Sequence, residues 1–176
     1  MSEFGFQSFP DFTSVLKYTN DSDHNIYSEV MKSHQRSSIG NETIEEYMLR
    51  EYRKPNSFKN FLYVSQLLQA EGISMGMEAH RRNRDICMGS LYWQLNDCWP
   101  VASWSSIDYY GKWKALHYKT RESFATNLIS FHKKIDEFDI YYVTDSLAES
   151  NLTLNLEMLD FKGNLIKSWT KTFKSK

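Results

Sequence analysis

The sequence predicts an α/β segment followed by a segment built only of β-strands. Three observations support this fold class. Apolar residues recur at helical spacing through much of the first half, and one short apolar run at residues 86–95 has the length of a buried strand. After Ala125, apolar and polar residues alternate with a period of two, which is typical of strands. We therefore expect two domains, residues 1–125 and residues 126–176.

Helices account for most of the region before the apolar run. Ser8 and Asp11 resemble a capping arrangement, and Pro10 suits the first turn of a helix. Together they predict a short helix over residues 11–18. Residues 19–41 are polar and rich in turn formers, so we expect a long loop that contains one helical turn.

Two longer helices follow this loop. Residues 42–53 carry apolar side chains at helical spacing, and Pro55 then ends the helix. Ser57 can cap the next helix, which has an apolar stripe on one face. We expect Gly72 and Gly76 to interrupt or bend that helix before its last turn.

The apolar run at residues 86–95 is predicted to be a strand with two distinct faces, because successive side chains of a strand point to opposite sides. One face holds Leu91, Trp93 and Leu95, and the other holds Tyr92 and Gln94. A loop follows the strand, and helical spacing returns over residues 112–124.

Four further strands are predicted after residue 125. They are residues 128–132, 138–144, 152–161 and 165–173. Alternation is clearest between Leu152 and Met158. A Lys-Gly-Asn turn at residues 162–164 joins the last two strands as a hairpin. We expect the four strands to form an antiparallel sheet.

Composition and charge argue against several classes of protein. A formal net charge of −1 gives no electrostatic reason to expect nucleic acid, and the sequence has no run of about 18 apolar residues that would predict a membrane span.

Cys87 and Cys98 flank the predicted strand, whose length holds them too far apart for a disulfide, so we expect free thiols. The histidines lack ligand spacing, so neither a metal nor a cofactor is expected. They are His24, His34, His80, His117 and His132.

Tryptophan density marks the most informative stretch of the chain, because four of the five tryptophans lie between residues 93 and 113. An indole offers a flat apolar face, and neighbouring short polar side chains offer hydrogen bonds. The combination suits a partner with apolar faces and many hydroxyls, such as a sugar ring. The alternative is that each tryptophan packs between elements of the fold. The interleaved polar residues are Asn96, Asp97, Ser103, Ser105 and Asp108.

Two motifs carry a family resemblance. Residues 2–8 read Ser-Glu-Phe-Gly-Phe-Gln-Ser, and residues 89–100 read Gly-Ser-Leu-Tyr-Trp-Gln-Leu-Asn-Asp-Cys-Trp-Pro. Shorter matches lie between them at residues 63–66, 69–72 and 78–82. In this order the motifs resemble the C-terminal part of the β-mannosidases of glycoside hydrolase family 2, over roughly residues 2–125.

The resemblance implies the C-terminal portion of a TIM (β/α)8 barrel, followed by a partial immunoglobulin-like antiparallel β-sandwich. The barrel portion would contain the end of strand seven, helix seven, strand eight and helix eight. Only two residues precede Glu3, and four strands are fewer than the roughly seven of a complete sandwich. We therefore expect both portions to be cut.

The resemblance also implies hydrolysis of terminal β-linked mannosides by double displacement, with a β-mannoside or manno-oligosaccharide as the ligand. One carboxylate attacks the anomeric carbon, while a second protonates the leaving oxygen and then activates water. Glu3 matches the family's nucleophile, and Trp93 matches a tryptophan that we expect to stack on the sugar. Asn96 and Asp97 are candidates for hydrogen bonds to its hydroxyls. The remaining tryptophans of the cluster, Trp99, Trp104 and Trp113, are expected to pack loop and helix onto the barrel.

The second carboxylate of the family lies upstream of every segment matched here. Asn41-Glu42 is an Asn-Glu pair, but we interpret it as a helix start, because an acidic residue in the first turn favours the helix dipole. Asp97 and Asp108 are other carboxylates near the tryptophans. From both we expect turn formation and capping after the strand.

Three hypotheses of function follow, each from a different class. The first hypothesis is that the chain is part of a retaining β-mannosidase. By itself the chain is then expected to be inactive, because the acid/base glutamate and most barrel strands are absent. The second hypothesis is a carbohydrate-binding module that uses the tryptophans without catalysis. The third is a structural or interaction fragment that self-associates through an exposed barrel edge.

Overall fold

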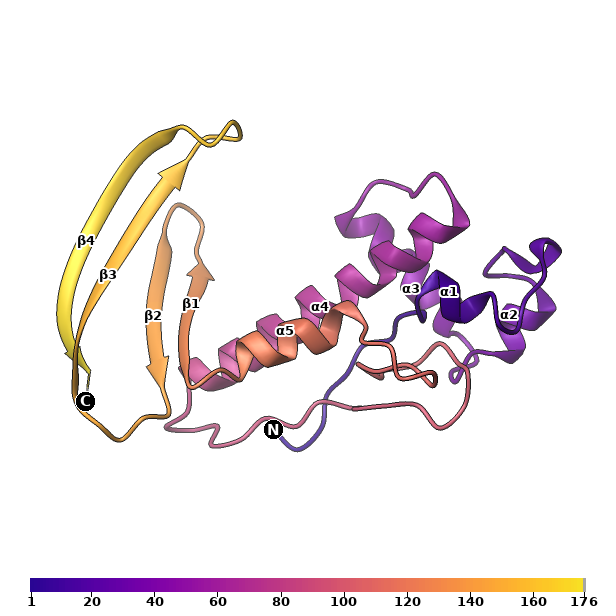
Figure 1. Ribbon diagram of the computed structural model, residues 1–176, viewed down its shortest axis with the longest axis horizontal. Coiled ribbons are helices and arrows are strands. Elements are labelled where there is room, and N and C mark those ends of the chain that lie inside the picture. Colours follow the sequence, from indigo (N-terminus) through magenta and orange to yellow (C-terminus); the bar gives the residue numbers. More distant parts are fainter. Residues whose placement is uncertain (176) are drawn as a thin grey trace. The chain divides into compact units, whose positions relative to one another are not determined.

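The computed structural model describes residues 1–175, which form two compact units, residues 1–143 and the segment that begins at Thr144. The helices are α1 (Phe12–Val15), the 3-10 helix η1 (Asp21–Asp23), α2 (Glu29–Ser33), α3 (Gly40–Glu51), α4 (Phe58–Arg82) and α5 (Ala115–Ser123). The strands are β1 (Asn127–Lys133), β2 (Phe138–Thr144), β3 (Ser150–Leu159) and β4 (Leu165–Ser175). All the helices precede the strands along the chain (Figure 1).

The first helix begins at the predicted place, but Asp11 caps it and Ser8 does not. The carboxylate of Asp11 accepts the N–H of Thr13 at 2.9 Å and so caps α1, satisfying a donor that the helix leaves unpaired. Ser8 does not cap the helix, because its buried hydroxyl donates to the amide oxygen of Gln69 at 2.7 Å. Turns follow α1, so the helix is shorter than the predicted residues 11–18.

The predicted loop at residues 19–41 contains more helix than the sequence suggested. It holds η1 and all of α2, where the hydroxyl of Ser28 accepts the N–H of Met31 at 3.2 Å. α3 begins at Gly40, two residues before the predicted start, and Glu42 occupies its first turn. Asn41-Glu42 therefore starts a helix, as predicted.

α4 is one continuous helix of 25 residues. Ser57 caps it as predicted, accepting the N–H of Asn60 at 3.2 Å. The expected interruption at Gly72 and Gly76 is wrong, because packing sustains the helix despite the poor helix propensity of glycine, while the alternative of a bend stays a prediction. At Gly76 the ring of Phe4 occupies the space that a Cβ would need, 2.8 Å away. Among residues 1–175, no helix has the length and apolar character to cross a membrane.

Two apolar clusters form the core of the first unit. The first cluster consists of Phe9, Val15, Ile26, Met31, Ile44, Met48, Leu62 and Ala102. The second consists of Ala70, Ile73, Met77 and Leu116, with Phe4, Phe6 and Tyr92 packed against it. α4 contributes side chains to both clusters, and so does the extended segment that carries Phe4 and Phe9. That segment is therefore held against α4 along its length.

The predicted strand at residues 86–95 does not form as a regular strand. The segment is extended, but it pairs with the N-terminal segment through one isolated parallel bridge between Phe4 and Tyr92. A strand needs a continuous ladder of backbone hydrogen bonds, and the described residues supply only a short one here. The predicted faces are present in part: Leu91, Trp93 and Leu95 are exposed while Tyr92 packs against the second cluster, but Gln94 lines the same pocket as Trp93.

The predicted single sheet is also wrong. The strands of residues 1–175 form two separate two-stranded antiparallel sheets, β1 with β2 and β3 with β4. In the second unit, β3 and β4 pair with Leu156 opposite Trp169. The predicted hairpin turn is confirmed: Gly163 adopts a φ of 87°, and the Asp160 carboxylate accepts the N–H groups of Lys162 and Asn164.

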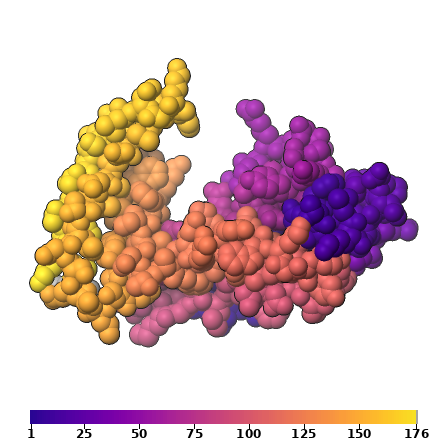
Figure 2. All heavy atoms as spheres, viewed as in Figure 1, coloured from indigo at the N-terminus to yellow at the C-terminus, as the bar shows by residue number. Residues whose placement is uncertain are grey.

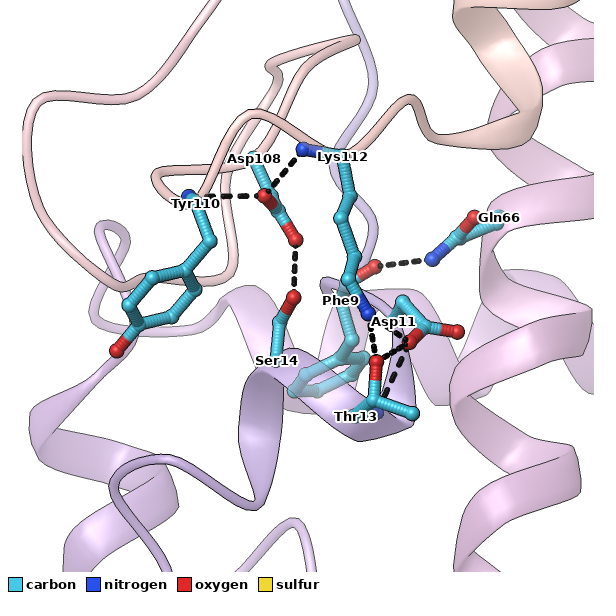
Figure 3. A network of polar contacts seen from close by, with 8 residues as sticks. All are labelled: Phe9, Asp11, Thr13, Ser14, Gln66, Asp108, Tyr110 and Lys112. Carbon is cyan, nitrogen blue, oxygen red and sulfur yellow. Dashed lines mark hydrogen bonds and ion pairs between the residues drawn. The ribbon is translucent and has the colours of Figure 1, made fainter.

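Asp108 links the loop between Trp104 and Trp113 to the N-terminal region (Figure 3). Its carboxylate accepts the hydroxyl of Ser14 at 2.5 Å and the N–H groups of Tyr110 and Lys112, both at 2.9 Å. Lys112 also forms an ion pair with Asp11 at 3.3 Å. On the surface, the indigo N-terminal region adjoins the region around residue 110 (Figure 2). The turn-forming role predicted for Asp108 is therefore confirmed.

A buried lysine lies at the centre of the polar framework of the first unit. Lys114 is 1% exposed, and its ammonium donates to the carbonyls of Ser8 at 3.1 Å and Ser103 at 3.3 Å. Burial lowers the pKa of Lys114 to about 8, and the charges of Asp97 and Asp108 oppose that shift. Both carboxylates are buried, so the ammonium stabilises charges that solvent does not reach.

We expect Lys114→Met to lower the free energy of unfolding by about 3–5 kcal/mol, because it leaves buried carboxylates without their cation. Lys119→Met is the matched control, since Lys119 is exposed and its ion pair with Glu122 is worth about 0–1 kcal/mol. Urea unfolding followed by circular dichroism measures both variants. Equal losses would contradict the framework role of Lys114.

Candidate functional site

A pocket of about 570 Å³ opens in the first unit between the N-terminal segment and residues 93–104. Its lining combines indole rings, a carboxylate, a guanidinium and several amide or hydroxyl groups. The lining residues are Glu3, Gly5, Arg36, Trp93, Gln94, Asp97, Cys98, Trp99, Val101, Ser103 and Trp104. Of the four residues that the sequence predicted for the site, the pocket brings together Glu3, Trp93 and Asp97.

Backbone pairing places Glu3 in the pocket. The N–H of Leu91 donates to the carbonyl of Met1 at 3.2 Å, and the N–H of Trp93 donates to the carbonyl of Phe4 at 2.8 Å. Glu3 lies between these two hydrogen bonds, so its position along the extended segment is fixed. Its side chain is exposed, which leaves the carboxylate accessible to a ligand in the pocket.

Gly5 allows the two segments of the pocket wall to approach closely. A Cβ at this position would lie 2.5 Å from the carbonyl oxygen of Trp93 and 3.0 Å from the indole Cδ1 of Trp104. The N–H of Gln94 also donates to the carbonyl of Trp104 at 3.1 Å, and this bond holds the Trp93-Gln94 segment against Trp104. A side chain at Gly5 would therefore push apart groups that form the pocket.

Three indole rings line the pocket. Trp93 is 49% exposed and Trp99 is 36% exposed, so each presents ring surface to solvent. The sequence predicted a packing role for Trp99 and Trp104, and the structure adds that both line the pocket. Trp113 lies outside the lining, with its ring edge against His117 at a centroid distance of 4.3 Å.

Asp97 lines the pocket, but its carboxylate is engaged inside the protein. One oxygen accepts the hydroxyl of Ser103 at 2.6 Å and the amide of Gln94 at 3.2 Å, and the other accepts the hydroxyl of Ser105 at 2.6 Å. The residue is 6% exposed, so these bonds satisfy a charge that water barely reaches. These partners are side chains and not the backbone N–H groups of a turn, so turn formation and capping by Asp97 stay a prediction.

Asn96 does not join the pocket lining. It is exposed and forms an isolated parallel bridge with Ile107, while its amide donates to the carbonyl of Asp97 at 3.4 Å. The sequence-based expectation that Asn96 binds hydroxyls in this pocket therefore has no support from the lining.

The pocket also contains residues that the sequence did not indicate. Arg36 comes from the stretch that was predicted to be a loop, and no motif or periodicity marked it. Gln94 and Cys98 belong to the tryptophan-rich segment, so their proximity to the predicted residues was the available signal. Arg36 reaches the site only through the tertiary fold.

The lining favours a neutral polyhydroxyl ligand. Indole faces stack on apolar ring faces, an accessible carboxylate accepts hydrogen bonds from hydroxyl groups, and a guanidinium donates hydrogen bonds to hydroxyl oxygens. Among residues 1–175, no group of three or more His, Cys, Asp and Glu side chains is placed to hold a metal ion. Cys87 and Cys98 are free thiols, as predicted.

No family model matches the sequence. The β-mannosidase of Capra hircus is 36% identical in an alignment of 172 positions that covers 90% of this chain and 20% of the goat protein. The β-mannosidase B of Aspergillus niger is 32% identical over 121 residues, covering 66% of this chain and 14% of the fungal protein. The chain belongs to the β-mannosidase family. It spans about a fifth of the length of the goat relative.

Two solved structures share the fold of this chain, and one of them is a β-D-mannosidase. The β-D-mannosidase of Dictyoglomus thermophilum superposes on all of this chain with a TM-score of 0.85 and 26% identity, over 23% of its own length. The exo-chitosanase of Amycolatopsis orientalis superposes on 96% of this chain with a TM-score of 0.79. At 17% identity the second match shows a shared fold alone.

We expect Gly5→Ala to lower the free energy of unfolding by about 1–3 kcal/mol, because the new methyl group meets a carbonyl oxygen at 2.5 Å. Gly72→Ala is the matched control, since nothing lies within 4 Å of a Cβ there and alanine favours a helix. Thermal and urea unfolding measure both variants. A Gly5→Ala protein as stable as the parent chain would show that the close approach is not required.

Proposed function

We propose that this chain forms the nucleophile side of the active site of a retaining β-mannosidase of glycoside hydrolase family 2. The observation that carries the proposal is that one pocket contains both Glu3 and Trp93. The family resemblance independently assigns these residues to attack on the sugar and to stacking against it. The proposed substrates are β-mannosides and manno-oligosaccharides.

The proposal assigns the elements of the chain to parts of a larger fold. The segment around Glu3 is the end of barrel strand seven, α4 lies in helix seven, residues 86–95 are strand eight, and α5 is helix eight. The exposed faces of Leu91 and Trp93 support this assignment, because they would point toward the barrel axis. The strands after residue 125 are assigned to a partial immunoglobulin-like sandwich.

The chemistry follows from the two kinds of carboxylate in the pocket. Glu3 is accessible, so its oxygen can attack the anomeric carbon and form a glycosyl-enzyme bond while the leaving oxygen departs with a proton from an acid. Asp97 cannot serve as that acid, because both of its oxygens already accept internal hydrogen bonds. We infer that the chain alone lacks an acid/base and does not turn over a β-mannoside.

A chimera tests the role of Glu3. In it, this chain replaces the aligned segment of the Dictyoglomus thermophilum β-D-mannosidase, which covers the whole of this chain. We expect turnover of a chromogenic β-mannoside, and Glu3→Gln should reduce kcat on the order of 10³-fold or more, because the nucleophile is lost. Steady-state kinetics measure the effect.

Glu46→Gln is the matched control in the chimera, because Glu46 is exposed on α3 and pairs with Arg50 outside the pocket. Its kcat should remain unchanged. A second readout is Glu3→Gly with azide, which should restore turnover by forming a mannosyl azide of inverted configuration. A chimera that stays active with Glu3→Gln, or a chain that by itself turns over substrate, would contradict the assignment.

The chain by itself is also a candidate sugar-binding protein, since residues 1–143 form the pocket without any other chain. We expect millimolar D-mannose to quench tryptophan fluorescence as it stacks on the indoles. Trp93→Phe should remove most of the quenching, whereas Trp169→Phe on β4 should leave it intact. Titration followed by emission spectra measures this, and equal quenching in both variants would exclude Trp93 as the stacking ring.

A further inference from the structure

Arg36 is the one cation in the pocket lining, and its guanidinium has no partner within residues 1–175. No hydrogen bond, ion pair or ring contact with another described residue engages this guanidinium, and the side chain is exposed. Arg81 shows the contrast, because its guanidinium donates to the carbonyls of Ser123 and Ala125 at 2.7 and 2.6 Å. The five donors of Arg36 are therefore free for a ligand.

Two backbone hydrogen bonds and one from a histidine ring hold the segment that carries Arg36 in place. The N–H of Arg36 donates to the carbonyl of Ala102 at 3.2 Å, and the N–H of Ala102 donates to the carbonyl of His34 at 2.8 Å. The ring of His34 donates from Nδ1 to the carbonyl of Pro100 at 2.6 Å. These three bonds join the Arg36 segment to the segment that carries Trp99.

A partly buried amide network holds the residues on either side of Arg36 in the sequence. The amide of Gln7 donates to the amide oxygen of Gln35 at 2.7 Å, and Gln35 donates to Asn41 at 2.7 Å. The N–H of Ser37 also donates to Gln35 at 3.0 Å. Gly40 leaves room for this network, because a Cβ there would lie 2.5 Å from Cδ of Gln35. The residues on both sides of Arg36 are thus fixed, while its own side chain is left unpaired.

We propose that Arg36 is a ligand-binding residue of this pocket, and that its guanidinium donates hydrogen bonds to adjacent hydroxyls of a neutral hexose. This inference rests on the proposed function and names a recognition residue for it. The accessible charges of the pocket are the carboxylate of Glu3 and the guanidinium of Arg36, which balance each other and suit an uncharged ligand. The planar fork of arginine reaches two neighbouring oxygens at once, which the point charge of lysine does not.

The fixed backbone predicts a measurable contribution to affinity. A ligand does not bear the cost of ordering the Arg36 backbone, since the protein has already ordered it. Hydrogen bonds to a charged group are stronger than neutral ones, so removal of the guanidinium should weaken binding roughly 10-fold or more. Arg36→Lys keeps the charge but loses the fork, and it should bind with intermediate affinity.

Alkylation of Cys98 in the complete chain reports whether the pocket is occupied. Cys98 is exposed and lines the pocket, whereas Cys87 lies outside it and serves as an internal control. The chain is treated with iodoacetamide over a range of D-mannose concentrations, and peptide mass spectrometry follows each cysteine separately. We expect D-mannose to slow alkylation of Cys98 and leave that of Cys87 unchanged.

Arg36→Met should raise the half-protecting concentration of D-mannose roughly 10-fold or more. Arg53→Met is the matched control, because Arg53 is exposed and outside the pocket, and it should match the parent chain. If Arg36→Met and the parent chain have the same unfolding curve, misfolding does not explain a loss of protection in the variant. Equal protection in Arg36→Met and the parent would overturn the role of Arg36 while leaving sugar binding intact.

Two further outcomes would also overturn the inference. If D-mannuronate protects Cys98 and D-mannose does not, the guanidinium selects an anion and the neutral class of ligand is wrong. If no sugar protects Cys98 in the parent chain, the pocket does not bind sugar as it stands and Arg36 has no such role. Neither outcome decides whether Glu3 is the nucleophile, because the chimera tests that assignment separately.

Discussion

The buried ammonium of Lys114 holds together the two segments from which the pocket is built. It donates to the carbonyls of Ser8 and Ser103, and these residues also exchange backbone hydrogen bonds of 3.0 and 3.2 Å. An ammonium without solvent needs acceptors and countercharge, which the carbonyls, Asp97 and Asp108 supply. Because this arrangement fixes the N-terminal segment beside the tryptophan-rich segment, Glu3 and Trp93 line one pocket.

Hydrogen bonding divides the charged groups of the pocket into two kinds. Asp97 is buried and its oxygens accept several internal donors, so it maintains the shape of the wall. Glu3 and Arg36 are exposed, and the structure gives them rigid backbone positions without using their charges internally. Both residues line the pocket, and no ion pair with another described residue engages either charge, which is why these two side chains carry our proposals.

Two incorrect predictions have the same physical origin. Residues 86–95 have the composition of a strand, and the four later segments have the alternation of a sheet, but strand formation requires partners along a ladder. One bridge at Tyr92 leaves the first segment merely extended, and the later strands pair only as β1 with β2 and β3 with β4. Alternation specifies faces, and in β3 the residues from Leu152 to Leu156 do alternate between half-buried and exposed. It does not specify how many neighbours a strand finds.

Local patterns in the sequence were enough to specify several features. Ser57 caps α4, Gly163 forms the hairpin turn, and the motif around Glu3 and Trp93 indicates the family, because caps, turns and motifs depend on residues close in the chain. The recruitment of Arg36 and Trp104 to the pocket, and the engagement of Asp97 by Ser105, depended on the tertiary structure. These contacts join residues through Lys114 and the packing of α4, and no short-range pattern encodes which of many polar side chains ends in the wall and which stays free.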